Sequence, residues 1–420
     1  MMKKQELPEA SIFCIDMCGF YASVSAVELG LDPLEVCLAV VGNQERKGSV
    51  VLAASPMMKK RFGVRTGTRL FEIPNHQDIL LVEPKMKLYL QKSMSITELL
   101  ASYVPKESIH IYSVDESFIE LTGTEKLWGP PESTMRRIQQ ELLDSFKLPS
   151  SVGGGPNMLL AKLALDLEGK NTGFAYWSYR DVPKKLWPVQ PLSRMWGIGS
   201  RTEKTLNSMG IFSVGDLACT DVAVLEKQFG IMGNQLYQHA NGIDLSDMGS
   251  PLVEGQISYG KGQILYRDYI EEQDIMTIIL EMCEDVAMRT RQARRAGRTI
   301  HLSIAYSKTA FGGGFSRSRS IDEATNDTME MYRVCQSLFR EHFQHKPVRQ
   351  ISLAISNLEE ESSMQLSLFD EKKFENRQLG EAMDTIRKRY GYSAIYRGIS
   401  ATQAGTAIAR TKLIGGHNKE

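Results

Sequence analysis

The sequence lacks a net charge, a disulfide framework and any long apolar run. Its 50 Lys and Arg residues balance 50 Asp and Glu residues over 420 positions. This balance argues against a nucleic-acid partner, because such proteins usually bring surplus basic residues to the phosphates. A hydrophobic content of 42% with 24% charged residues is typical of an ordinary globular protein. These values exclude disordered, collagen-like and disulfide-scaffold classes.

Cysteines are few and scattered. Six are present, and only Cys14 and Cys18 are close in sequence, so no second pair completes a zinc site. Free thiols in a reducing compartment are the simplest interpretation. Residues 1–11 contain no apolar signal region, and no stretch reaches about 18 consecutive apolar residues. We therefore expect a cytoplasmic protein without a membrane partner.

The apolar periodicity predicts two α+β segments with a helical segment between them. The first segment has strands at 11–17, 49–54 and 109–121, helices at 18–28, 57–62, 87–103, 131–146 and 157–168, and a glycine turn at 153–155. Residues 192–218 are predicted as two helices around glycine turns, and 246–254 as a polar linker. The second segment has strands at 256–266, 299–306 and 349–357 and helices at 274–295 and 324–342.

Acidic residues in apolar strands are the sharpest chemical feature. Asp16 follows one strand directly, and Asp115 and Glu116 lie within another. Adjacent strand residues point to opposite faces, so a bulge or a strand end is needed for both to reach one site. Three carboxylates around two Mg²⁺ ions suit phosphoryl transfer, because this cation prefers oxygen ligands. The alternative is that these acids are exposed and paired with Lys or Arg.

Five blocks occur in order along the chain: IDMCGFYASVSAVE, VVLAASPMMKKRFGV, IYSVDESFIEL, GGGPNMLLAKLALDLEGK and MWGIGSRTEKTLNSMGI. Their order and spacing closely resemble the Y-family (UmuC/DinB-like) DNA polymerases, which copy damaged templates, and most closely the UmuC-like branch of Gram-positive bacteria and their mobile elements. The resemblance covers most of the chain. It implies an α+β right-hand polymerase with a palm (1–19 and 86–177), fingers (20–85), a helix-hairpin-helix thumb (178–245), a linker (246–255), a little finger (256–358) and a tail (359–420).

The resemblance also assigns the catalytic residues. Asp16 and Asp115 would ligate both Mg²⁺ ions, Glu116 would hold the ion that activates the primer 3′-hydroxyl, and the Met17 carbonyl would complete one shell. Phe20 and Tyr21 would line the nucleotide pocket. The Tyr21 ring would act as the steric gate that leaves no room for a ribose 2′-hydroxyl. The alternative for these two aromatic residues is packing at the start of a core helix.

Two lysines match positions at which the family binds the triphosphate. These are Lys170, after the helix that follows the glycine turn, and Lys60, at which the alternative is a solvated lysine beside Lys59 and Arg61. Met57 departs from the tyrosine that the family often has there, so the grip of the fingers on the triphosphate is less well defined. We expect Lys162 to face solvent or DNA.

Glycines and arginines are the expected DNA contacts. The Gly197 and Gly199 turn resembles a helix-hairpin-helix, whose backbone amides donate hydrogen bonds to a phosphate, and a plain turn between two helices is the alternative. Acids fill residues 268–288, and basic residues without acids fill 289–319. Charges that complement a helix dipole explain part of this pattern. A DNA-binding edge explains its continuation into strands, and its expected contacts are Arg289, Arg291, Arg294, Arg295, Arg298, Arg317 and Arg319.

A short peptide in the tail resembles the segment by which bacterial polymerases dock on the sliding clamp (β subunit). It consists of Gln365, Leu366, Ser367, Leu368 and Phe369. Leu and Phe anchors in an apolar pocket would supply the binding energy. The alternative is a further strand of the little finger.

The sequence therefore predicts a monomeric, error-prone translesion DNA polymerase of the SOS mutagenesis type. Its substrates would be primer-template DNA and deoxynucleoside triphosphates, and its cofactor two Mg²⁺ ions. One alternative is a catalytically silent member of the family that acts as a clamp- and DNA-binding adaptor. Another is a different palm-type nucleotidyl transferase such as a cyclase, which would need neither the helix-hairpin-helix nor the clamp peptide.

Overall fold

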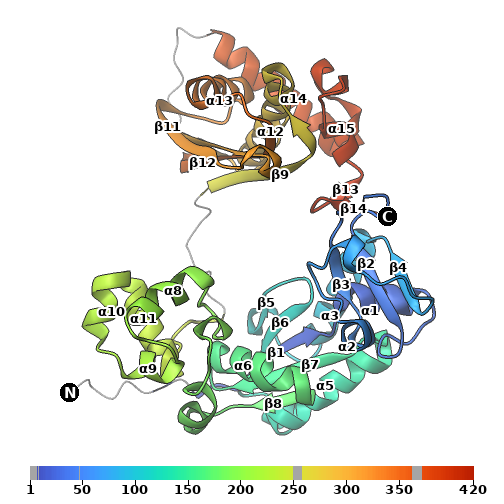
Figure 1. The fold of residues 1–420 in the computed structure, drawn as a ribbon, viewed down its shortest axis with the longest axis vertical. Coiled ribbons are helices and arrows are strands. Elements are labelled where there is room, and N and C mark those ends of the chain that lie inside the picture. The colour runs from blue at the N-terminus through green and yellow to red at the C-terminus, as the bar shows by residue number, and fades with distance from the viewer. Residues whose placement is uncertain (1–6, 8, 47, 249–257, 362–370) are drawn as a thin grey trace. The chain divides into compact units, whose positions relative to one another are not determined.

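The chain divides into two compact units in the computed structural model, which describes residues 7, 9–46, 48–248, 258–361 and 371–420. Unit 1 comprises Met1–Ser250 and His417–Glu420, and unit 2 comprises Pro251–Gly416 (Figure 1). Within the described ranges, no helix is both long enough and apolar enough to cross a bilayer.

A five-stranded palm sheet forms the centre of unit 1, in the order β5-β6-β1-β7-β8. The strands are β1 (Ile12–Met17), β5 (Ile109–Ile111), β6 (Glu116–Glu120), β7 (Ser150–Gly155) and β8 (Phe174–Tyr176). The single strand predicted at 109–121 is wrong, because the chain turns between β5 and β6. The N–H groups of Tyr112 and Ser113 both donate to the Glu116 carbonyl and close that turn.

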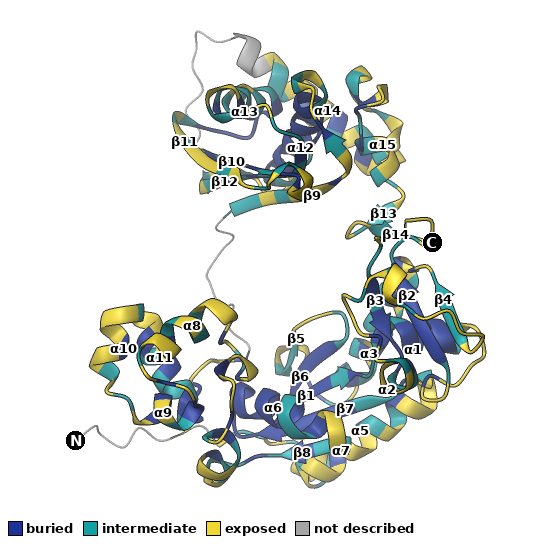
Figure 2. Ribbon diagram, in the orientation of Figure 1, coloured by how far each residue is buried: buried dark blue, intermediate teal, exposed yellow. Residues whose placement is uncertain are grey.

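Helices cover both faces of the palm sheet. Two of the helices beside the palm sheet are α3 (Met86–Ala101) and α5 (Pro131–Phe146), and the short α4 (Glu125–Trp128) lies between β6 and α5 in the chain. The helix α6 (Met158–Ala164) is buried along its whole length (Figure 2), and a π-helical turn (Leu165–Gly169) and α7 (Lys170–Thr172) follow it. Cys14, two residues before Asp16 on the same face of β1, packs in a cluster with Ala161 of α6.

The glycine turn predicted at 153–155 is instead part of β7. A Cβ atom on Gly153 would lie 2.2 Å from the Ala161 carbonyl oxygen, so only glycine lets α6 pack directly on this strand. The glycines therefore set the depth of α6, and with it the depth of every side chain that α6 carries toward the sheet.

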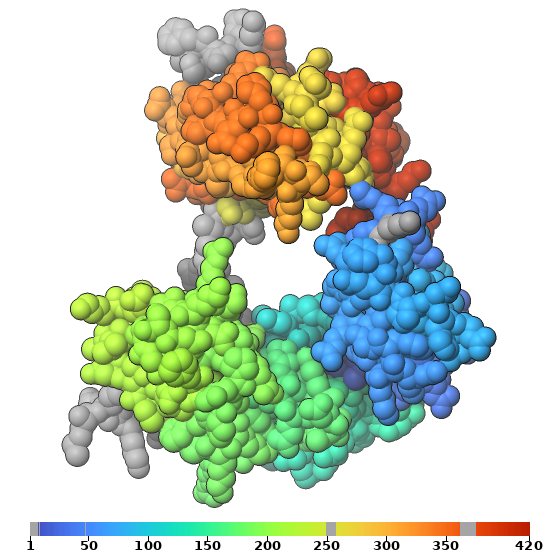
Figure 3. Space-filling model, viewed as in Figure 1, coloured from blue at the N-terminus to red at the C-terminus, as the bar shows by residue number. Residues whose placement is uncertain are grey.

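Two lobes flank the palm in unit 1, one in blue and one in light green in Figure 3. The fingers segment contains α1 (Phe20–Glu28), α2 (Pro56–Phe62) and a sheet in the order β3-β2-β4, with β2 (Cys37–Val41), β3 (Val51–Ala54) and β4 (Ile79–Val82). The thumb segment contains α8 (Ser200–Ser208), α9 (Val214–Cys219), α10 (Val222–Phe229) and α11 (Ile231–Ala240).

Unit 2 is an antiparallel sheet with helices packed on one face. The strands are β9 (Ser258–Tyr269), β10 (Arg295–Tyr306), β11 (Gly314–Thr325) and β12 (Val348–Glu360), in the order β11-β10-β12-β9. The helices are α12 (Glu272–Gln292) and α13 (Thr328–His342), and Ile300, Leu302 and Ile304 of β10 share their core. The sequence did not predict β11, whose alternating serines resemble a loop.

The tail, for which the sequence predicted no fold, adds α14 (Glu371–Tyr390), α15 (Ala407–Arg410), β13 (Leu413–Ile414) and β14 (His417–Asn418). Arg387 of α14 pairs with Glu284 of α12 at 3.1 Å, and both side chains are buried. Arg397 reaches the other Glu284 oxygen at 3.1 Å. The last residues return to unit 1, where the Lys419 carbonyl accepts a hydrogen bond from the Lys87 N–H at the start of α3.

Candidate active site on the palm sheet

Strand pairing brings two of the three predicted acids together, and the third lies in the adjoining turn. Asp16 on β1 lies directly opposite Glu116 on β6 in the antiparallel register, so the two side chains share one face of the sheet. Asp115 precedes β6 in the turn, and its carbonyl accepts a 2.9 Å hydrogen bond from the Met17 N–H. Its carboxylate accepts a 2.6 Å hydrogen bond from the Ser113 hydroxyl. The acidic doublet therefore lies at a strand end rather than at a bulge, with Glu116 as the first residue of β6 and Asp115 directly before it.

Two lysines neutralise these acids. The Lys170 ammonium lies 2.8 Å from Asp16, and the Lys162 ammonium lies 2.6 Å from Glu116. The pairing with lysine that the alternative predicted is thus present for both carboxylates, but neither is exposed: the side chains of Asp16 and Glu116 are 18% and 10% exposed. Within the described part of the chain, no group of three His, Cys, Asp or Glu side chains is arranged to hold a metal ion. The oxygen donors nevertheless suit Mg²⁺, since carboxylates on one face can rotate toward a shared cation.

Asp16 and its partner Lys170 both have a raised pKa, but for different reasons. Burial raises the pKa of Asp16, although the hydrogen bond from Lys170 acts in the opposite direction. Burial alone would lower the pKa of Lys170, but hydrogen bonds to Asp16 and Asp166 raise it. Lys170 is therefore a permanent cation beside the acids. Its side chain is 44% exposed, so it can reach a triphosphate as well as Asp16.

The expectation that Lys162 faces solvent or DNA is wrong. Its side chain is 7% exposed, inside the face of α6 that packs on the palm sheet. Burial alone would lower the pKa of Lys162, but the hydrogen bond to Glu116 raises it. The Cys14 thiol also donates to Glu116, at 3.0 Å. Burial, followed by the nearby Glu116 charge, raises the pKa of Cys14, so this side chain stays a neutral S–H donor.

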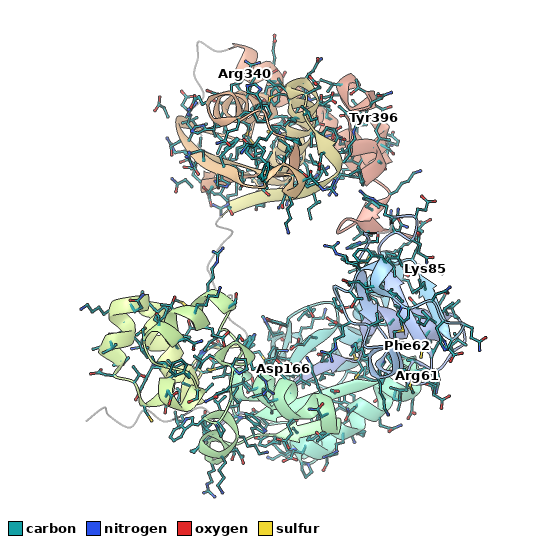
Figure 4. The ribbon with its side chains drawn as sticks, in the orientation of Figure 1. Arg61, Phe62, Lys85, Asp166, Arg340 and Tyr396 are labelled. Carbon is teal, nitrogen blue, oxygen red and sulfur yellow. The ribbon has the colours of Figure 1, made fainter. Side chains whose placement is uncertain are left out.

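Asp166 connects the two lysines, and the sequence gave no role to it. Its carboxylate lies 3.2 Å from the Lys162 ammonium and 2.8 Å from the Lys170 ammonium. Each lysine is four residues away, one on either side, which is the spacing of neighbours on a helix surface. Asp166 lies in the π-helical turn after α6 (Figure 4). The chain Asp16–Lys170–Asp166–Lys162–Glu116 is therefore continuous.

The two aromatic residues after the acids occupy different environments. Phe20 is 2% exposed and packs in the core, as the structural alternative predicted for one of the pair. Tyr21 is half-buried, and its ring stacks on Tyr89 of α3 with centroids 4.4 Å apart and planes 13° apart. The Tyr89 hydroxyl shares a 2.7 Å hydrogen bond with Ser25. The sequence did not identify Tyr89, whose spacing is simply that of a core helix.

The fingers segment offers a cation other than the one predicted. Lys60 and Lys59 are both exposed on α2, but the Lys59 ammonium lies 3.9 Å from the position of a Cβ on Gly19, in the loop after Asp16 and Met17. Arg61 pairs with Asp78 at 2.9 Å and lies over the Phe62 ring, as the labelled side chains in Figure 4 allow the reader to follow. Met57 packs against the apolar core of the fingers.

The thumb turn has the geometry that close backbone approach requires. Gly197 has a φ of 92°, which favours glycine, and neither Gly197 nor Gly199 has an atom within 4 Å of a built Cβ. Gly199 precedes α8, so the free amides of that helix start at an open surface. The Trp196 indole donates to the Tyr112 hydroxyl at 3.3 Å and joins the thumb turn to the β5–β6 turn.

The predicted arginine edge of unit 2 does not form one free surface. The expectation that Arg291 contacts DNA is wrong, because its side chain is 6% exposed and pairs with Asp384 of α14 at 2.7 Å. Arg298 pairs with Glu359, and Arg319 pairs with Glu341 on the helix-covered side of the sheet. Arg289 donates to the Gly260 carbonyl at 2.7 Å. Exposed members that remain are Arg294 and Arg317, while Arg295 begins β10 and is partly buried.

The open face of this sheet carries small hydroxyl side chains. In the strand register, Thr299, His301 and Ser303 of β10 lie opposite Ser320, Ser318 and Ser316 of β11. The His301 ring makes hydrogen bonds of 3.0 Å and 3.2 Å with Ser318 and Ser316. Such a face brings little charge to a ligand, but it allows close approach to the sheet backbone. The predicted clamp peptide at 365–369 lies outside the described residues.

Comparison with known families matches three segments of the chain. The impB/mucB/samB family model matches residues 15–166, its C-terminal domain model matches 256–368, and the IMS family HHH motif matches 179–211. The matched segments contain the three acids, the arginine-rich strands and the thumb turn.

Individual relatives match along their whole length. A Bacillus subtilis (strain 168) protein named "Putative UV-damage repair protein UvrX" is 53% identical over 419 residues, covering 99% of this chain and 100% of its own. "DNA polymerase IV 2" of the same organism is 36% identical, covering 98% and 100%. Among solved structures, a Y-family DNA polymerase chimera, Dbh-Dpo4(243-245)-Dbh, has a TM-score of 0.63 at 20% identity, covering 83% of this chain and 98% of its own.

Proposed function

The chain belongs to the impB/mucB/samB family of Y-family polymerases, and from this premise we propose that it is a DNA-directed DNA polymerase of the translesion type. It would add deoxynucleotides to a primer 3′ end opposite damaged template bases. The observation that carries the proposal is the direct pairing of Asp16 with Glu116 across β1 and β6, with Asp115 in the adjoining turn. Two paired strands thus present two carboxylates on one face of the sheet, and the third acid lies in the turn directly before β6.

Asp16, Asp115, Glu116 and the Met17 carbonyl would hold two Mg²⁺ ions. When bound, such a pair activates the attacking hydroxyl and stabilises the leaving pyrophosphate. The protein would supply fixed positions for Asp16 and Glu116, since both lie on paired strands, and Asp115 lies in the turn that adjoins them. Lys170 would leave Asp16 and turn toward the triphosphate when the carboxylates take up their ligands, because its permanent charge suits phosphate oxygens.

The nucleotide pocket would be closed by the fingers and by Tyr21. The stacked pair Tyr21 and Tyr89 gives the gate a backing that an isolated ring would not have. Lys60 and Lys59 of α2 are both candidates for the triphosphate contact. The position of the Lys59 ammonium beside the Gly19 loop favours Lys59. Either contact would be electrostatic, because Met57 supplies no hydroxyl.

Primer-template DNA would contact the thumb turn and unit 2. Gly197 and Gly199 leave backbone amides open to a phosphate, and Arg294 and Arg317 are exposed near the strands of the second sheet. We also propose that the peptide at 365–369 docks on the sliding clamp. Replacing Leu368 and Phe369 with Ala should remove stimulation by the clamp and leave basal synthesis unchanged.

Primer extension tests the proposal directly. The full chain is incubated with Mg²⁺, all four deoxynucleotides and a labelled primer on undamaged template and on templates with defined lesions. Extension that requires Mg²⁺ and passes a lesion supports the proposal. Tight DNA binding without any extension would instead identify the catalytically silent adaptor, and nucleotide cyclisation without a primer would identify another class of nucleotidyl transferase.

A further inference from the structure

Glu116 is held by donors that come from two different elements. The Lys162 ammonium approaches from α6 at 2.6 Å, and the Cys14 thiol approaches from β1 at 3.0 Å. Both reach the same oxygen, Oε1. In the part of the chain that the structure describes, no donor reaches the second oxygen, Oε2. The carboxylate is therefore fixed at one oxygen while the other stays available.

The two lysines of the site differ in how far they can move. Lys162 is 7% exposed and lies in a helix that the Gly153 contact presses against the sheet. Lys170 is 44% exposed and stands after the π-helical turn. An enclosed lysine cannot leave its partner without leaving the core, whereas Lys170 can exchange Asp16 for another anion. Both are lysine–carboxylate pairs, and they differ in how deeply the lysine is buried.

Oriented partners of ligating carboxylates determine how well these groups bind a cation, because they fix the rotamer and the free lone pairs. We propose that Lys162 is a positioning residue for Glu116, holding Oε1 so that Oε2 is the oxygen offered to a divalent cation. The expected effect on kcat rests on the proposed polymerase function. The expected effect on cation binding can be measured whether or not the chain is a polymerase. Lys162 itself touches neither nucleotide nor DNA in this account.

A simple countercharge would act in the opposite direction. If Lys162 only neutralised Glu116, its removal would leave the site more negative and would tighten the binding of a divalent cation. If Lys162 positions the carboxylate, its removal lets Glu116 turn away from the cation, and binding weakens. The sign of the change in cation affinity therefore separates the two roles.

The test uses the full chain with Mn²⁺ as the probe and follows free Mn²⁺ by electron paramagnetic resonance. We expect Lys162→Met to weaken Mn²⁺ binding about 10- to 100-fold and to lower kcat by a similar factor, with the KM for deoxynucleotide nearly unchanged. Lys162→Arg should recover part of both losses. By contrast, Lys170→Met should raise KM, because that lysine is proposed to bind the triphosphate.

Lys185→Met is the matched control. Lys185 also pairs with a carboxylate, Glu168, at 2.8 Å, but Glu168 is not one of the three acids and the Lys185 side chain is 36% exposed. This variant should leave Mn²⁺ affinity and kcat unchanged. Circular dichroism checks that each variant is folded. If Lys162→Met fails to fold, Lys162→Gln takes its place, since its amide keeps one hydrogen bond without the charge.

Unchanged or tighter Mn²⁺ binding in Lys162→Met, or its replacement, would overturn the inference. So would a wild-type chain that binds no Mn²⁺. The polymerase proposal fails separately, if the wild-type chain binds Mn²⁺ but extends no primer. In that case the order of Mn²⁺ affinities among the variants still decides whether Lys162 positions Glu116.

Discussion

At the scale of single residues, the site depends on side chains whose roles follow from their partners. Asp16 and Glu116 could be identified from sequence because acids in apolar strands are costly to bury without compensation. Lys162 could not, because an apolar helical pattern with one lysine usually places that lysine at the surface. Its burial depends on Glu116, 46 positions earlier in the chain. Only the folded sheet brings this countercharge to it.

The Tyr21 ring should set sugar selectivity. Tyr21→Ala is expected to raise incorporation of ribonucleotides relative to deoxynucleotides by at least about tenfold, because the space below the sugar would then admit a 2′-hydroxyl. Tyr21→Phe keeps the ring stacked on Tyr89 and should keep the discrimination. Single-nucleotide incorporation with paired ribo- and deoxynucleotides measures both. Equal discrimination in the Ala variant and the wild type would contradict the gate.

At the scale of elements, close packing of α6 on β7 determines the depth of the site. Gly153→Ala should destabilise unit 1 by about 1–3 kcal/mol, because the new methyl group would overlap the Ala161 carbonyl. Gly48→Ala has open space and no positive φ, so it should change stability by less than about 0.5 kcal/mol. Urea unfolding of both variants measures the free energy of unfolding. Equal losses of stability in the two variants would contradict this role of Gly153.

The tail helix α14 should be part of the folded second unit. Arg387→Met leaves Glu284 buried with one partner fewer and should cost about 3–5 kcal/mol. Arg340→Met removes an exposed pair with Glu272, whose side chains are 60% and 41% exposed, and should cost less than about 1 kcal/mol. Thermal or urea unfolding compares the two variants. A loss for Arg387→Met no larger than that of the control would mean that the tail adds no stability.

The elements also show where sequence reasoning ends. The strand β1, a continuous apolar run, and the strand β10, whose second half alternates, were both predicted to within a few residues. The strand β11 was not, because residues 314–320 hold serines, arginines and glycine with a single aromatic residue. The sequence predicted no fold for the tail because it has few apolar residues. Two of its arginines, Arg387 and Arg397, find their carboxylate partner on α12, which lies about 100 positions earlier in the chain.

At the scale of the whole molecule, a net charge of zero conceals local use of charge. Glu281 and Glu284, counted among the acids of the second unit, are buried and satisfied by the tail: Glu281 accepts from the Thr406 and Ala407 N–H groups. Arg291 is likewise internal. The acids and arginines that complement each other inside the protein are therefore unavailable to a ligand. Charge that reaches DNA must be counted among exposed residues alone.

DNA binding should consequently be salt-dependent despite the balanced composition. We expect affinity for primer-template DNA to fall at least about tenfold between 50 and 200 mM salt, because phosphate contacts release counterions. Arg317→Ala should reduce the slope of log affinity against log salt by about 0.9 for one lost contact. Arg340→Ala, an arginine already paired with Glu272, should leave it unchanged. Fluorescence anisotropy measures both slopes, and binding insensitive to salt would exclude phosphate contacts.

The central claim is that the carboxylates paired across β1 and β6 perform nucleotidyl transfer. The most direct measurement is the Mg²⁺-dependent rate at which one deoxynucleotide is added to a primer by the wild type, Asp16→Ala, Glu116→Ala and the surface variant Asp144→Ala, all verified as folded. The account predicts no detectable addition by the first two variants and the wild-type rate for Asp144→Ala, whose carboxylate accepts a hydrogen bond from Gln140 on the surface of α5. Retained addition by Asp16→Ala or Glu116→Ala would contradict it.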